Sequence, residues 1–363
     1  MSKIKKTKNT TPLTSIEFNH IEHKKPIYRI KSPLKEHLKH YSRLDDLPIT
    51  YEDLTQYDEL YPLDDDNGKK TLWHMAMYNQ ENLKFLSKAL VEVYQKLLSE
   101  GDHIPYLIID RIDFCSFGNS QPFRVRVVNQ INENHDYFYV KKADSSRIYG
   151  LELEEIFSPD RVNYLVDKQT LIEDHIVGIP ADDFILRYKG VAIENRLRLA
   201  KEFVKFNERT FVRLLGDMRA YNFVVEITQD FDNVQYRIRA MDFDQQSFEG
   251  RKNIYKPQFY KDNIELVKLV QELMTEEVTN QYQRIERVAM KKRFFASRHR
   301  TRSLLRIMRK DRISTNANIE VLRSELAIHH NDDSFLNFKN MGDILNRHLE
   351  RSLNVEILSK SEL

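Results

Sequence analysis

The chain has 363 residues, of which 41% are hydrophobic and 31% are charged, with a formal net charge of only +2. This is enough for one large or two modest domains with a buried core, and bulk charge does not make the chain a polyanion binder. The single cysteine, Cys115, excludes an internal disulfide framework and any cysteine-based zinc site. One cysteine suits a reducing cytosol, so we expect a cytoplasmic protein.

Charge is unevenly spread along the chain. Residues 1–40 hold ten Lys and Arg against three Glu, whereas residues 45–66 hold nine acidic residues and no Lys or Arg. We expect 1–40 to form a loosely ordered arm, and 45–66 to pack on the surface of the body because apolar residues lie among its charges. No run approaches the roughly 18 apolar residues of a spanning helix, so we expect no transmembrane segment.

The first predicted helical region is residues 71–99, where leucines and a valine recur at steps of three and four, the stripe of an amphipathic helix. Three strands are predicted next, at residues 106–114, 123–130 and 136–143, the second from clear alternation of apolar and charged residues. The loop 115–122 joins the first two strands. The third strand ends in Lys141 and Lys142, and strand alternation lets only one of them face inward.

A short helix is predicted at residues 145–157, because serine can cap its start and Ser158-Pro159 ends it. Two further strands, 161–166 and 170–176, are joined by a turn. A long amphipathic helix then covers residues 193–215.

Two acidic motifs follow that helix. Asp217 and Asn222 lie five apart between two apolar runs, and a later apolar run ends in Asp242-Phe243-Asp244. A hairpin of strands 223–226 and 235–241 would return Asp242 to the edge where Asn222 lies. Phosphoryl transfer needs a carboxylate beside the attacking hydroxyl and oxygen ligands for Mg²⁺, and these residue types supply both.

This pair of motifs resembles the catalytic and metal-binding loops of the protein-kinase-like superfamily. The likeness is strongest to the aminoglycoside and choline kinase type and to HipA-like kinases. The resemblance implies a two-lobed α+β fold, with a small antiparallel-sheet N-lobe and a mainly helical C-lobe. Residues 67–180 would form the N-lobe with an added helix, residues 181–363 the C-lobe, and residues 1–66 an arm and acidic segment.

The resemblance also implies roles for individual residues. Asp217 would orient or deprotonate the acceptor, and Arg219 would stabilise the transferring phosphoryl group. Asn222, Asp242 and Asp244 are the implied metal ligands.

The small lobe would hold the nucleotide. Lys141 is the implied phosphate ligand, and a helix glutamate would pair with it; Glu154 is preferred and Glu152 is the alternative. The loop around Gly118 would cover the phosphates. The implied adenine-binding hinge is the backbone of Glu173, Asp174, His175 and Ile176.

Leu215-Gly216 stands where most protein kinases have His-Arg before the catalytic aspartate, which again resembles small-molecule kinases. We therefore expect a phosphotransferase that uses ATP and Mg²⁺ on a small-molecule or other hydroxyl acceptor. The alternative is a kinase-like pseudoenzyme that serves as a nucleotide-binding or regulatory module. A third hypothesis is a nucleic-acid-associated protein that uses residues 1–40 and 291–312.

The segment 291–312 holds ten Lys and Arg against one Asp, and it mixes them with apolar residues. Such an amphipathic basic helix or helix pair is typical of a solvated face over a core stripe. It is also a candidate surface for a polyanion or acidic partner.

Overall fold

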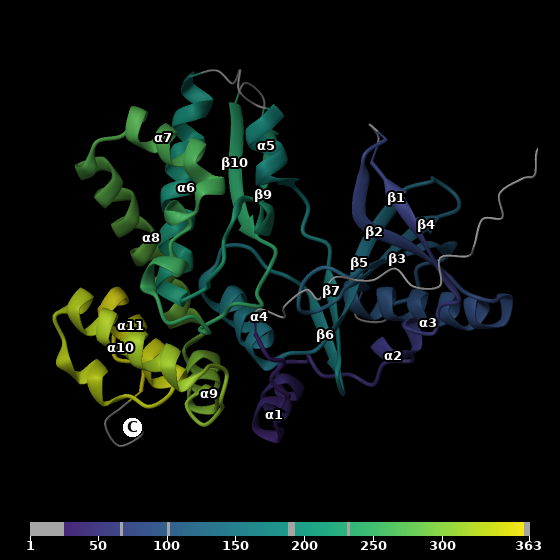
Figure 1. Cartoon of the computed structure of the whole chain (residues 1–363), viewed down its shortest axis with the longest axis horizontal. Helices are drawn as coiled ribbons and strands as arrows, with labels where there is room; N and C mark the ends of the chain where they lie inside the picture. The colour runs from purple at the N-terminus through teal and green to yellow at the C-terminus, as the bar shows by residue number, and fades with distance from the viewer. Residues whose placement is uncertain (1–24, 66–67, 100–101, 188–192, 231–232, 359–363) are drawn as a thin grey trace, which may run out of the picture.

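The computed structural model describes residues 25–65, 68–99, 102–187, 193–230 and 233–358. One half of the molecule is a large antiparallel sheet, and the other half combines helices with a smaller sheet (Figure 1). The α+β class predicted from the sequence is therefore confirmed. Among the described residues, every helix is too short or too polar to cross a bilayer.

The large sheet has seven strands in the order β1-β2-β3-β4-β5-β7-β6, and every neighbouring pair is antiparallel. The strands are β1 (Glu59–Asp64), β2 (Lys70–Met77), β3 (Leu107–Cys115), β4 (Phe123–Asn129), β5 (His135–Lys142), β6 (Tyr164–Asp167) and β7 (Thr170–Asp174). Helices α2 (Tyr51–Leu54) and α3 (Gln80–Ser99) accompany it (Figure 1). Leu90 and Val93 of α3 pack with Val125 and Phe138 of the sheet in one apolar core.

Two expectations about the first hundred residues need correction, whereas the expected packing of the acidic segment on the body agrees with the structure. Residues 70–77 form strand β2 and not the start of the helix, which begins at Gln80. The last part of the expected arm is helix α1 (Ser32–His40), whose Leu34 and Leu38 are buried in the larger core. The acidic segment supplies strand β1, which pairs with β2 at the sheet edge. Strand and helix signals overlap in short apolar runs, and tertiary pairing decides between them.

Helix α4 (Ser145–Phe157) lies between the two halves of the molecule (Figure 1). In sequence it separates β5 from β6, yet β5 pairs directly with β7. After α4 and β6, the chain therefore comes back to the sheet as β7, directly beside the strand β5 that precedes α4. Leu171 of β7 belongs to the larger core and Ile172 to the sheet core, so β7 divides the two cores.

In the part of the chain that the structure describes, the larger half combines helices with a three-stranded sheet in the order β10-β9-β8. Its strands are β8 (Ile179–Pro180), β9 (Phe223–Asp230) and β10 (Asn233–Ala240). Its helices are α5 (Ala181–Arg187), α6 (Ile193–Arg213), α7 (Ile264–Leu273), α8 (Glu276–Ala296), α9 (Arg298–Met308), α10 (Asn316–His330) and α11 (Met341–Leu353). The division of the chain at residues 66 and 180 stays a prediction.

The basic segment 291–312 spans the end of α8 and all of α9. Its apolar residues Phe294, Leu304, Leu305 and Met308 are buried in the larger core, as an amphipathic pattern predicts. Arg300 from the same segment binds the buried carboxylate of Glu152 on α4, with its Nη2 2.5 Å from Oε1. Part of the basic segment therefore holds the core together.

Candidate functional site

The chain turns sharply where helix α6 ends. Leu214 and Asp217 both have left-handed backbone torsions, with φ of 54° and 57°. A non-glycine residue rarely adopts this region, and such strain is often held at functional sites. The turn is fixed because Gly216 N–H donates to the Gln245 carbonyl at 3.2 Å and the Gln246 side chain donates to the Arg213 carbonyl at 2.6 Å. These bonds come from residues 242–246, here called the metal loop after the role that the resemblance implies. This segment holds Asp217 in place.

Asp217 gathers the other residues of its loop. Arg219 Nε lies 3.0 Å from Asp217 Oδ1, and Asn222 Nδ2 donates to the Asp217 carbonyl at 2.7 Å. The Asp217 N–H donates to the hydroxyl of Tyr260 at 3.0 Å, and the Arg219 guanidinium lies over the Tyr260 ring. Three of the residues expected to act together, Asp217, Arg219 and Asn222, therefore form one cluster.

The hairpin β9–β10 brings the second motif to this cluster. Phe223 pairs with Ala240, and Met241 N–H then donates to the Asn222 carbonyl at 3.0 Å. Asp242 follows directly, so it leaves the hairpin beside Asn222. The hairpin expected from the sequence forms, with longer strands than predicted.

An arginine that the sequence analysis did not single out links the metal loop to the sheet. Arg147, on the first turn of α4, is 2% exposed. Its Nη1 donates to Asp242 Oδ1 at 2.8 Å and to Asp244 Oδ1 at 2.9 Å. Its Nε and Nη2 bind the two carboxylate oxygens of Glu173 on β7, Nη2 at 2.7 Å. This network joins α4, β7 and the metal loop.

Lys141 enters the same network. Its Nζ donates to Glu173 Oε2 at 2.5 Å, and the side chain is buried. Lys142 points elsewhere, with its Nζ 3.1 Å from Gln121 Oε1. Lys141 is thus the inward member of the pair, on the same network as Asp242 and Asp244.

The expected glutamate partner of Lys141 is wrong. Glu154 forms an ion pair with Arg213 of α6, and the alternative, Glu152, binds His37 and Arg300. The reason is the direction of α4, which sends these two glutamates toward helices of the larger half and presents Arg147 to the sheet. The acidic partner of Lys141 comes from β7 instead.

Glu173 also cannot serve as the expected start of a hinge. Its strand lies between β5 and β6, where Glu173 pairs with Tyr139 on one side and Tyr164 on the other. Asp174 still lies in the strand, and its N–H donates to the Asn163 carbonyl at 2.9 Å. An adenine-binding backbone would therefore begin at His175 and Ile176, which follow the strand.

The loop 116–122 lies against the lysine pair. Lys142 N–H donates to the Ser120 carbonyl at 3.4 Å, and Gly118 has a left-handed φ of 92° with open space where a Cβ would stand. A glycine accepts this torsion at no steric cost. The loop expected to cover phosphates thus sits at the end of the strand that carries Lys141.

The buried charges of the network shift the pKa values of its three carboxyl groups in different directions. Burial opposes ionisation of Glu173, but Arg147 and Lys141 outweigh it and lower the pKa of Glu173 to about 2. Burial and the charge of Asp244 raise the pKa of Asp242. For Asp244, burial again opposes ionisation, but the charges of Arg147, Lys25 and Lys141 and the hydrogen bond from Arg147 together outweigh it, so the pKa of Asp244 is lowered. Asp242 is therefore the carboxyl group of the metal loop that gains most from an added cation.

The donor set fits a metal of the Mg²⁺ type. Asp242, Asp244 and Asn222 offer hard oxygens, and Mg²⁺ is commonly held by one or two carboxylates together with substrate phosphates. Arg147 engages Oδ1 of each aspartate, which leaves Oδ2 of each for a metal. Among the described residues no group of three or more His, Cys, Asp or Glu side chains could hold a metal by itself. A bound Mg²⁺ would therefore depend on the nucleotide for ligands.

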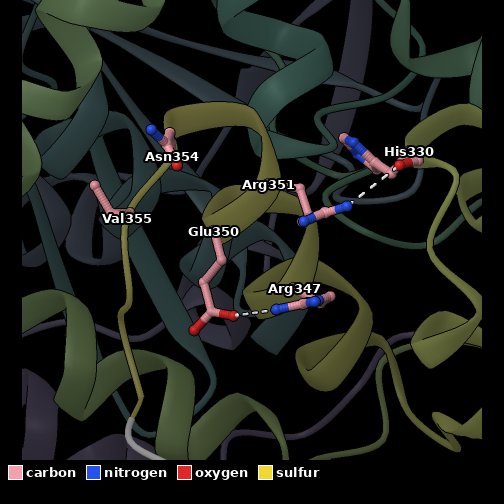
Figure 2. Close-up of a pocket in the computed structure, with 6 residues that line it drawn as sticks. All are labelled: His330, Arg347, Glu350, Arg351, Asn354 and Val355. Atoms are coloured by element: carbon pink, nitrogen blue, oxygen red, sulfur yellow. Dashed lines mark hydrogen bonds and ion pairs between the residues drawn. The ribbon is translucent and has the colours of Figure 1, made fainter.

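A pocket of about 320 Å³ lies at α11, in the helical half, and is shown in Figure 2. Arg347 and Arg351 of α11 line it, but both are ion-paired with Asp332, and Arg347 also contacts Glu350. Arg351 further donates to the His330 carbonyl, as the dashed line in Figure 2 shows. Positive and negative charges balance there, and none of the expected site residues lies in it.

Comparison with known proteins adds little. No family model matches the chain, and no curated protein matches it. One similar solved structure is the Rio2 kinase–ADP/Mg²⁺–phosphoaspartate complex from Chaetomium thermophilum, at 9% identity over 68% of this chain and 79% of that chain, with a TM-score of 0.29. Another is the Rad53 kinase domain and SCD2 in complex with AMPPNP, at 13% identity over 62% of this chain and 94% of that chain, with a TM-score of 0.25. At these scores neither likeness bears on the function of this chain.

Proposed function

We propose that the protein is an ATP- and Mg²⁺-dependent phosphotransferase of kinase-like organisation that acts on a hydroxyl acceptor. The observation that carries the proposal is the convergence of Asp217, Asn222 and Asp242 at one end of a β-hairpin. Asn222 bonds the Asp217 backbone through its side chain and Met241 through its carbonyl. The loop of Asp217 and Asn222 therefore adjoins the end of the hairpin that Asp242 follows, and phosphoryl transfer needs an acceptor carboxylate and metal ligands close together.

In this proposal the residues divide the work. Asp217 accepts the proton of the attacking hydroxyl. The hydroxyl oxygen bonds to the γ-phosphorus of ATP, and the bond from that phosphorus to the bridging oxygen breaks, so ADP leaves. Arg219, held on Asp217 at 3.0 Å and partly exposed, is placed to neutralise charge on the transferring group. Asn222, Asp242 and Asp244 hold Mg²⁺, which supplies charge neutralisation on the phosphates. Lys141 sets the positive potential at the sheet side of the site.

The choice of acceptor rests on the turn before Asp217. Gly216 stands there because a Cβ would lie 3.2 Å from the Gln245 carbonyl oxygen, so a larger residue would push the metal loop away. An arginine at this position, as in the protein-kinase type, would require the Gln245 backbone to move by a few tenths of an ångström. This favours a small-molecule hydroxyl as acceptor, of the kind that aminoglycoside and choline kinases use.

The test is ATP turnover by the purified chain with Mg²⁺ over a panel of hydroxyl acceptors. Asp217→Asn should abolish phosphate transfer and leave ATP binding intact, because this residue acts on the acceptor. Asp58→Asn, a matched change at an exposed aspartate of the sheet half, should leave both unchanged. Turnover that survives Asp217→Asn at the wild-type rate would rule out the proposed role.

A second candidate is a nucleotide-binding module without turnover. It is favoured by Arg147, which binds both metal-loop carboxylates where a catalytic metal would be held. Under this alternative ATP binds without hydrolysis or transfer, even after long incubation and with every acceptor.

A polyanion or acidic partner at residues 291–312 is also a proposal, and it requires binding that weakens steeply with salt.

A further inference from the structure

The segment before helix α1 runs along the phosphate end of the candidate site. Residues 25–31, here called the N-terminal strap, are tied to the start of α4 through their backbone. Tyr28 N–H donates to Asp144 Oδ1 at 2.8 Å. Ser145 N–H donates to the Tyr28 carbonyl, and its hydroxyl donates to the Arg29 carbonyl, both at 2.8 Å. The strap is therefore fixed in place by hydrogen bonds to two adjacent residues.

The side chain of Lys25 reinforces this attachment. It is 3% exposed and forms an ion pair with Asp144, which is also buried. Its ammonium lies 5.6 Å from the centre of the Tyr28 ring and 5.9 Å from that of Phe248. A buried ammonium is costly unless it is paired. The strap therefore stays closed only while Lys25 keeps its carboxylate partner.

The strap forms one wall of a small cavity. The opposite walls belong to the loop 116–122, to Lys142, to Asp144 and to Asp244 of the metal loop. The lining residues are Lys25, Pro26, Ile27, Asn119, Ser120, Lys142, Asp144 and Asp244. The volume in which the centre of a water molecule can lie is about 10 Å³. The cavity therefore has room for about one water. A phosphate group does not fit while the strap is in this position.

We propose that the N-terminal strap is an autoinhibitory closure of the phosphate end of the site, latched by the ion pair of Lys25 with Asp144. This inference rests on the proposed function, since it assigns the covered cavity to the phosphates of a nucleotide. Nucleotide binds only after the latch opens, so its apparent affinity is reduced by the fraction of molecules that are closed. Loss of the Lys25 charge shifts the population toward the open state.

The first measurement is calorimetric titration of the full-length chain with ATP and Mg²⁺. Lys25→Met keeps a long unbranched side chain and removes the charge that pairs with Asp144, so we expect the dissociation constant to fall about tenfold. Lys25→Arg keeps a cation and should stay closed. Lys39→Met, a matched change at an exposed lysine of α1, should not alter binding. Weaker binding by Lys25→Met would make Lys25 a phosphate ligand and overturn the inference.

A second measurement does not require nucleotide. An Asn119→Cys variant, changed in the cavity wall, is labelled with a thiol reagent, and mass spectrometry distinguishes this label from labelling of buried Cys115. Adding Lys25→Met should speed labelling about tenfold, in parallel with the affinity. An unchanged labelling rate in a folded variant overturns the closure. Faster labelling without nucleotide binding by any variant supports the closure and contradicts the proposed function instead.

Discussion

Arg147 and Asp242 are joined by a hydrogen-bonded ion pair of 2.8 Å, although they lie 95 residues apart in the chain. The same guanidinium holds Glu173 and Asp244. One buried guanidinium therefore contacts the carboxylate of the sheet strand and both carboxylates of the metal loop. If a metal binds to these aspartates, its binding and the stability of the fold would depend on the same side chain.

Replacing Arg147 by Met should destabilise the fold and sensitise it to Mg²⁺. Removing one partner of a buried ion pair costs about 3–5 kcal/mol because it leaves uncompensated charge. Here the uncompensated groups are carboxylates that a divalent cation can neutralise. We expect calorimetry to show a lower melting temperature for Arg147→Met, and a larger increase on addition of Mg²⁺ than for the wild type.

Arg213→Met is the matched control for this experiment. It also breaks a buried arginine–glutamate pair, but the side chain of Arg213 pairs with Glu154 and not with a carboxylate of the metal loop. Its melting temperature should fall without any added response to Mg²⁺. Equal Mg²⁺ responses in the two variants would contradict the assignment of Asp242 and Asp244 as metal ligands.

The pH dependence of stability should include a contribution from Glu173. Its pKa is about 2 in the folded chain, against an ordinary value of 4.5. The lowered pKa means that the ionised form stabilises the fold above pH 4.5, and that this stability is lost as the pH falls from about 4.5 to about 2. The loss is on the order of 3 kcal/mol. Denaturant midpoints measured across this range should decline less steeply for Glu173→Gln.

A glutamine at an exposed glutamate of α10, Glu320→Gln, provides the comparison. Its curve should follow the wild-type curve throughout. If Glu173→Gln kept the full wild-type slope below pH 4.5, the buried charge network would not be the source of acid sensitivity.

Gly150 should be needed for the fit between α4 and the metal loop. A Cβ at this position would lie 2.9 Å from Phe243 Cβ and 3.2 Å from Gln246 Cβ. Alanine raises helix propensity by up to about 1 kcal/mol, so any loss must come from overpacking, which costs about 1–3 kcal/mol. We expect Gly150→Ala to lower stability and to weaken ATP binding by displacing the loop.

Gly342→Ala separates these two effects. Its Cβ would lie 2.4 Å from the backbone nitrogen of Arg309, so it should also lose stability, but at the contact between α11 and α9. The folded fraction of this variant should bind ATP normally. A loss of affinity as large as that of Gly150→Ala would show that the effect is not local to the metal loop.

The sequence predicted those parts of the site that depend on local spacing. Asp217 and Asn222 share a short loop, and Asp242 follows a hairpin whose pairing is set by its own strands. These distances along the chain are short, so a pattern of residues is enough to place them. The fold class followed for the same reason, from strands and helices in a recognisable order.

The remaining parts of the site depend on contacts between distant segments. Arg147 reaches Glu173 across 26 residues and Asp242 across 95, and nothing in the helix sequence marks it as buried. Lys25 meets Asp144 across 119 residues. The kinase-like resemblance implied a glutamate on α4 as the partner of Lys141, but the rotation of that helix against the larger half decides which residue faces the sheet. Periodicity does not record such a rotation.

The most direct test of the account is the Mg²⁺ dependence of ATP binding in the wild type and in Asp242→Asn, followed by titration calorimetry. We predict that the affinity of the wild type for ATP falls at least about tenfold when a chelator removes Mg²⁺. Asp242→Asn should have this low affinity for ATP both with and without Mg²⁺. ATP binding that is indifferent both to Mg²⁺ and to Asp242→Asn would contradict the proposed site.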